Sequence, residues 1–205
     1  MTDSSSELDN NYTITDLLRV MERLRDPEYG CPWDLQQDFR SIVDSTLEES
    51  YELVSAIEAA DYEHVREELG DVLFQVVFYA QLGREKNLFD FPGIVNTLVE
   101  KLLRRHPHVF ANGAIEGVVA ATTAVDEVAS AWESGKRKER MARSQTGVLD
   151  DVPVNLPALS RAQKITKRAA QVGFDWLDTD GVMAKVEEEL AEFAAAREES
   201  PERAE

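Results

Sequence analysis

Apolar residues recur every three to four positions along most of the chain, the spacing that gathers them on one face of an α-helix. Runs of alternating β-branched residues, which are typical of strands, are almost absent. The first expected helix is short and follows the candidate caps Thr13 and Thr15. Its apolar face comprises Leu17, Leu18, Met21 and Leu24. The pattern predicts an all-α fold.

Capping residues and prolines predict where the later helices begin and end. Ser45 and Glu48 have the spacing of a capping box and therefore open a second helix. A long apolar helix is expected over 61–83, and a fourth over 90–105, where the following His-Pro pair ends it. Further helices are expected at about 126–138, 158–172 and 182–196.

The chain contains an internal echo, which indicates a repeated helical unit. The segment 47–53, LEESYEL, is answered by 187–193, EEELAEF, and each follows a Trp/Asp pair by a short distance. Turn-forming residues over 145–157 indicate a linker between the two copies. The expected organisation is a disordered tail over 1–12, a main helical domain over 13–140, a linker over 141–157, and a partial second repeat over 158–205.

The charge of the chain argues against some classes of function. The chain has 40 acidic and 22 basic residues and therefore a net charge of −18. Nucleic-acid binding needs a basic face, so we expect no nucleic-acid partner. The single cysteine, Cys31, fits a reducing compartment. No apolar leader opens the chain, and the longest apolar run is too short to span a bilayer. We therefore expect a cytoplasmic protein with no membrane partner.

Four acidic residues on two successive helices form a candidate metal site. Glu49 and Glu52 lie three residues apart, as do Glu68 and Asp71, so each pair shares one helix face. If the two helices pack as an antiparallel hairpin, four carboxylates converge, and hard cations such as Mg²⁺ prefer such ligands. No Glu-x-x-His motif accompanies them, which disfavours a di-iron site. The three histidines are interpreted as surface or helix-end residues.

A solvated acidic face is the alternative, because so acidic a chain should show this spacing about once by chance. The stretch DVLFQVVFYAQL, which Asp71 opens, is apolar nearly all round and therefore predicts a helix buried on most sides. An acid in such surroundings is costly unless it is paired or binds a metal. The basic triplet Lys101, Arg104 and Arg105 fits a phosphate clamp, with a helix-dipole role as the alternative. For Trp132, base stacking competes with core packing.

Several motifs in order resemble the MazG family of nucleoside triphosphate pyrophosphohydrolases, within the all-α NTP pyrophosphatase superfamily. They are CPWD at 31–34, EESYE followed by EELGDVLFQVVFYAQ, then KLLRRHPHVF, and later LPALSRAQKI with VGFDW. The resemblance covers about 13–193. It implies an all-α helical bundle that dimerises and cleaves nucleoside triphosphates to the monophosphate and pyrophosphate. The cofactor it implies is Mg²⁺, with Mn²⁺ as a substitute, and the implied role is housecleaning of the nucleotide pool.

The resemblance also assigns residues. The family signature, EExxE and then ExxD, falls on Glu48, Glu49, Glu52, Glu68 and Asp71, of which the last four would be metal ligands. Glu48 is the candidate base for the attacking water. Because it directly precedes Glu49 on the helix, its side chain points in a different direction from that of Glu49. Nucleotide-contacting positions of the family match Lys101, Arg104, Arg105 and Trp132, and the start of a second site matches Lys185 and Glu189.

Two departures from the family pattern keep other functions open. Asp38 and Phe39 stand where the family usually has Thr-His, which leaves base selection open. The second copy has no later ExxD, so activity is expected from the first copy. A catalytically silent helical module that binds nucleotide or protein is one alternative. A pyrophosphatase restricted to one deoxynucleotide is the other.

Overall fold

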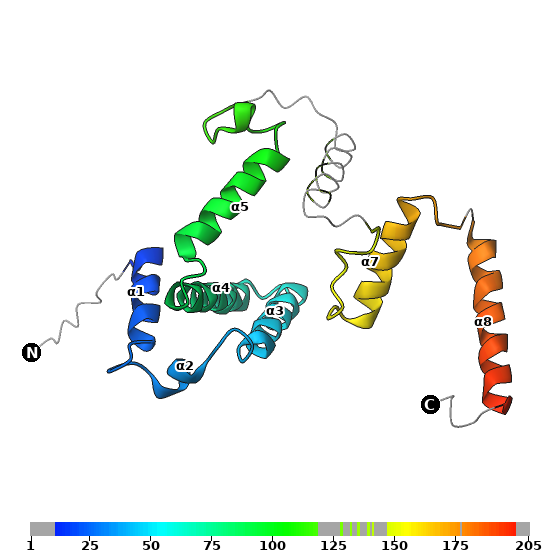
Figure 1. Cartoon of the computed structure of the whole chain (residues 1–205), viewed down its shortest axis with the longest axis horizontal. Helices are drawn as coiled ribbons and strands as arrows, with labels where there is room; N and C mark the ends of the chain where they lie inside the picture. Colours follow the sequence, from blue (N-terminus) through cyan, green and yellow to red (C-terminus); the bar gives the residue numbers. More distant parts are fainter. Residues whose placement is uncertain are drawn as a thin grey trace, which may run out of the picture. The chain divides into compact units, whose positions relative to one another are not determined.

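The computed structural model describes residues 11–118, 147–176 and 178–199, together with five single positions between 119 and 146. It divides into two compact units, Met1–Ala121 and Thr122–Glu205, which we describe separately. Across the described ranges every regular element is a helix and no strand occurs, which confirms the all-α prediction (Figure 1). The predicted domain boundaries stay predictions.

The first unit begins its helices at residues whose side chains satisfy free backbone N–H groups. Asp61 accepts from the backbone N–H of His64 at 3.2 Å, and Asp90 accepts from that of Gly93 at 2.9 Å. These caps confirm the predicted starts of the long helix and of the one that follows. The elements are α1 (Ile14–Leu24), α2 (Pro32–Gln36), α3 (Val43–Glu58), α4 (Tyr62–Glu85), α5 (Phe91–Arg105) and the 3₁₀ turn η1 (Ala111–Gly113).

The structure differs from the prediction at the start of one helix and by one additional short helix. Ser45 was expected to open a helix, but α3 begins two residues earlier at Val43. The reason is that the Asp38 carboxylate accepts from the backbone N–H groups of Arg40 and Ser41, which turns the chain into the helix before Ser45 is reached. The short α2 was not predicted at all. The helix expected at 126–138 lies mostly outside the described residues.

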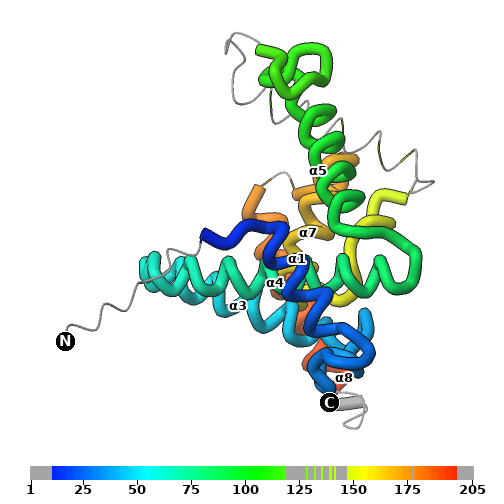
Figure 2. Tube along the Cα trace, turned by 90° about the vertical axis from the view of Figure 1, so that its left-hand side faces the viewer, coloured from blue at the N-terminus to red at the C-terminus, as the bar shows by residue number. Residues whose placement is uncertain are grey.

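Helices α3 and α4 form an antiparallel hairpin around which the first unit is arranged. They are joined by a tight turn at 59–61, and both views show them side by side (Figures 1 and 2). Helices α1 and α5 each pack against α4. The buried core lies where α1 and the segment before α3 meet α4. Its side chains are Met21, Ile42, Val77, Phe78 and Leu82.

The second unit contains α7 (Ala158–Ala170) and α8 (Thr179–Glu199), close to the helices predicted at 158–172 and 182–196. The buried Arg168 of α7 is paired with Asp151 and so ties the preceding loop to the helix. Among the residues described, no helix combines the length and apolarity needed to cross a bilayer.

Candidate metal centre

Three carboxylates meet between α3 and α4. Glu49 from α3 and Glu68 and Asp71 from α4 each offer one oxygen, and these oxygens lie within 4.8 Å of one another. Within the described residues, no other set of three or more His, Cys, Asp or Glu side chains has this arrangement. The antiparallel hairpin therefore brings together three of the four predicted ligands.

Glu68 is the buried member of this carboxylate cluster, with 7% of its surface exposed. One oxygen, Oε1, lies 2.5 Å from Nε2 of His64. The other, Oε2, is buried and has no hydrogen-bond partner. A buried carboxylate oxygen without a partner is costly, because it has lost its water and gained nothing in exchange. A hydrogen-bond donor or a cation at this oxygen would remove that cost.

Crowding of like charges is the second electrical feature of the cluster. Burial raises the pKa of Glu49 above its ordinary value of 4.5, and the carboxylates of Asp71, Glu52, Glu68 and Glu48 raise it further. A divalent cation would relieve both the crowding and the unpartnered oxygen. All donors are carboxylate oxygens, which suit Mg²⁺ or Mn²⁺ and not a thiolate-preferring metal. The residues present thus fit the ion that the sequence implied.

The fourth predicted ligand, Glu52, is outside the three-carboxylate group. It lies one turn after Glu49 on α3, is exposed, and is near enough for its charge to act on the Glu49 carboxyl. Glu48 is exposed on the same helix.

The expectation that Asp71 is buried is wrong, since Asp71 is exposed and Glu68 takes the buried position. Helix α4 is not buried on most sides as expected, since Leu69, Leu73 and Val76 are exposed as well.

The predicted phosphate clamp lies elsewhere in the first unit. Lys101, Arg104 and Arg105 occupy the last two turns of α5. Helix α5 packs against α4, and in both views its C-terminal end rises away from the α3–α4 hairpin (Figures 1 and 2). The structure therefore does not bring the triplet beside the carboxylates within this unit. Trp132 is a described helical position of the second unit.

His64, interpreted from the sequence as a surface or helix-end residue, is exposed on the first turn of α4, and what the sequence did not predict is its contact with Glu68. The sequence lacks Glu-x-x-His, and the contact follows His-x-x-x-Glu instead, the i, i+4 spacing that joins neighbours on a helix.

The unusual Asp38-Phe39 pair has structural contacts in this chain. Asp38 caps the turn before α3, and Phe39 stacks on Tyr79 with ring centroids 5.9 Å apart.

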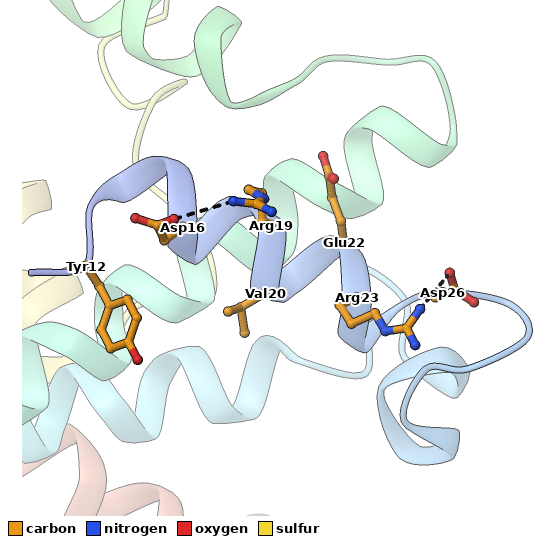
Figure 3. Close-up of a pocket in the computed structure, with 7 residues that line it drawn as sticks. All are labelled: Tyr12, Asp16, Arg19, Val20, Glu22, Arg23 and Asp26. Carbon is orange, nitrogen blue, oxygen red and sulfur yellow. Dashed lines mark ion pairs between the residues drawn. The ribbon is translucent and has the colours of Figure 1, made fainter. Parts of the chain in front are cut away.

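A surface hollow of about 540 Å³ lies on the outer side of α1 (Figure 3). Four of its five charged side chains are paired with one another, Arg19 with Asp16 and Arg23 with Asp26, and the fifth, Glu22, is paired with Arg84. None of the predicted site residues lines it. In the second unit, the ammonium of Lys185 lies 2.8 Å from Glu188 and 3.1 Å from Glu189, so two acids of the second copy share one cation.

Comparison with known proteins gives concordant matches. Residues 37–110 match the model of the MazG nucleotide pyrophosphohydrolase domain. The chain is 51% identical over 179 residues to a nucleoside triphosphate pyrophosphohydrolase of Escherichia coli, covering 87% of this chain and 65% of that protein. It is 42% identical over 182 residues to a nucleoside triphosphate pyrophosphohydrolase/pyrophosphatase MazG of Thermotoga maritima, covering 89% of this chain and 66% of that protein. The chain thus spans just under two thirds of the length of these relatives.

Proposed function

Because the chain belongs to the MazG family, we propose that it hydrolyses nucleoside triphosphates to the monophosphate and pyrophosphate. The carboxylate cluster on the α3–α4 hairpin is the proposed reaction site. The observation that carries the proposal is the unpartnered, buried Oε2 of Glu68 beside two further carboxylates. We expect this chemistry in the cytoplasm.

Each acid has a proposed role at this site. Glu49, Glu68 and Asp71 would hold Mg²⁺, or Mn²⁺ in its place, with Glu52 as the fourth ligand reaching in from the next turn of α3. The bound ion would neutralise charge on the triphosphate and on the leaving pyrophosphate. Glu48 is the proposed proton acceptor for the attacking water.

A second copy of the chain is the proposed partner. The α3–α4 hairpin leaves one apolar stripe exposed on each helix, with six large side chains between 37% and 56% exposed. Stripes of this size on a two-helix layer favour burial against another such layer, which gives a four-helix bundle. The stripe residues are Leu47, Tyr51 and Val54 on α3, and Leu69, Leu73 and Val76 on α4.

The same assembly offers a place for the basic triplet. A chain of net charge −18 repels a triphosphate, so cations near the cluster are needed for binding. Since Lys101, Arg104 and Arg105 lie away from the cluster of their own unit, we propose that they contact the phosphates bound at the partner's cluster. Trp132 stays a proposed contact for the base.

The test is pyrophosphate release from a mixture of ribo- and deoxyribonucleoside triphosphates, with Mg²⁺ and with EDTA. Metal-dependent pyrophosphate without orthophosphate is the expected result and establishes cleavage between the α- and β-phosphates. The Glu52→Gln variant is expected to lose this activity while its circular dichroism stays unchanged. Full activity in that variant would remove Glu52 from the ligand set.

The silent binding module is the second candidate function, favoured by the contacts of Asp38 and Phe39, which serve the fold and leave no family-type pair for the base. It predicts nucleotide binding without turnover. Turnover measured separately for the eight common nucleotides distinguishes a broad enzyme from one restricted to a single deoxynucleotide.

A further inference from the structure

His64 makes a contact with the carboxylate cluster that the proposed mechanism does not use. It lies on the first turn of α4, one turn before Glu68, and its Nε2 is 2.5 Å from the Glu68 Oε1. Half of the His64 side chain is exposed, whereas only 9% of the Glu68 side chain is. An ionised carboxylate only accepts, so the form of His64 that suits this contact carries its proton on Nε2. The histidine therefore holds one oxygen of the most buried acid in the cluster.

Because of this contact, the two oxygens of Glu68 have different surroundings. Oε1 is taken by His64, and Oε2 is left buried and without a hydrogen-bond partner. A free carboxylate can rotate about its last bond and can bind a cation through both oxygens. With Oε1 held, rotation is restrained and Oε2 alone is left for the ion. Partners of this kind, which touch a ligand and not the metal, orient the ligand and are worth about 10- to 100-fold in metal affinity.

We propose that His64 is a positioning residue, which fixes the Glu68 carboxylate so that Glu68 binds the divalent ion through Oε2 alone. The inference rests on the proposed function, since it requires the carboxylate cluster to hold the ion. The proposal adds His64, a residue outside the family signature, to the proposed metal site. It also specifies that Glu68 binds the ion through a single oxygen. His64 itself stays outside the set of oxygens that lie within 4.8 Å of one another.

The test is titration of the whole chain with Mn²⁺ alone, followed by calorimetry, for four variants and the unaltered protein. In His64→Ala the Mn²⁺ dissociation constant is expected to rise about tenfold or more. In His64→Gln the amide can donate across the same i, i+4 spacing, so affinity is expected to return to within about threefold of the unaltered protein. Tyr62→Ala is the matched control, since it removes an exposed ring from the same turn of α4. Glu68→Gln removes the ligand itself.

Kinetics supply an independent readout. The Mg²⁺ concentration for half-maximal activity is expected to rise in His64→Ala, while kcat at saturating Mg²⁺ stays near that of the unaltered protein. Unchanged Mn²⁺ affinity in His64→Ala, with binding lost in Glu68→Gln, would overturn the positioning role and leave the proposed metal site standing. Equal loss in His64→Ala and His64→Gln would also overturn it, because a polar side chain placed against Oε1 would then not matter. Retained Mn²⁺ binding in Glu68→Gln would overturn the metal site and this inference together.

Discussion

At the scale of single residues, the signature acids have different surroundings, so replacing each of them should affect metal binding and turnover differently. Glu68 is buried within the cluster, whereas Glu48 is exposed beside it. Replacing a metal ligand weakens binding of the ion and also lowers the rate of hydrolysis. Replacing the general base slows proton transfer and leaves binding of the ion unchanged. We expect Glu48→Gln to lower kcat by at least about 100-fold while leaving the Mn²⁺ dissociation constant unchanged. Parallel calorimetry and turnover assays check this, and weaker Mn²⁺ binding in Glu48→Gln would place Glu48 among the ligands.

Because negative charges crowd around Glu49, we expect Glu49→Gln to stabilise the metal-free protein and to weaken metal binding. Its raised pKa shows that the ionised carboxyl is disfavoured in the absence of a cation. Glu49→Gln removes that repulsion, so at neutral pH with EDTA this variant should melt at a higher temperature than the unaltered protein. With Mg²⁺ the order should reverse, because only the unaltered site gains from binding the ion. Thermal unfolding under both conditions measures this, and an Mg²⁺-induced rise of equal size in the two proteins would exclude Glu49 as a ligand.

At the scale of helices, Arg25 fastens the end of α1 to the end of α4. Its Nε and Nη2 donate to the two oxygens of Glu85 at 2.8 and 2.7 Å, and its Nη1 donates to the backbone carbonyl of Gln37 at 3.2 Å. The Arg25 side chain is 7% exposed, and the guanidinium lies 5.4 Å from the centre of the Phe78 ring. The contact joins α1, the segment after α2 and α4, which are distant in sequence.

This contact predicts a pH dependence of stability. The hydrogen bond from Arg25 lowers the pKa of Glu85 below 4.5, and that from Gln81 adds to it against the opposing effect of burial. The stabilisation is therefore present above the ordinary pKa and is lost as the pH falls through the lowered one. Glu85→Gln should lower the free energy of unfolding at pH 7 by about 1–3 kcal/mol.

Denaturant unfolding from pH 7 down to pH 3 measures this difference. The gap between Glu85→Gln and the unaltered protein should shrink toward the acid end, because both side chains are then neutral. A gap that stays constant over this range would show that the Glu85 charge does not contribute.

At the scale of the whole molecule, the proposed dimer would form through the exposed stripes on α3 and α4. A charge in the middle of a buried apolar interface is costly, so Val54→Glu and Leu73→Glu should each convert the assembly to monomers. Val20→Glu is the control, since Val20 is 52% exposed on α1, outside the hairpin. Size-exclusion chromatography with light scattering reads the mass. If the basic triplet serves the partner's site, the monomeric variants should also lose pyrophosphate release, whereas a monomeric variant with full activity would contradict the shared site.

The sequence by itself determined the helices and most of their ends, because capping and apolar spacing are local properties. Asp61, Asp90 and the His-Pro pair after α5 act within a few residues of the backbone they affect. The start of α3 was missed because the Asp38 carboxylate accepts from the backbone N–H groups of Arg40 and Ser41 and so turns the chain into the helix before Ser45 is reached. The carboxylate spacing likewise indicated Glu49, Glu52, Glu68 and Asp71, of which the structure groups all but Glu52.

Only the tertiary structure decided which acid is buried and what holds it. Burial depends on which side of α4 its neighbours cover, and this made Glu68, and not Asp71, the enclosed carboxylate. The i, i+4 spacing of His64 and Glu68 is visible in the sequence. Only the packing of α3 against α4, which places Glu49 next to Glu68, connects this contact with the carboxylate cluster. The position of the basic triplet also depends on the direction of α5, which packing against α4 sets. Helical spacing fixes neighbours within one element, whereas the electrostatics of a site depend on distances between elements.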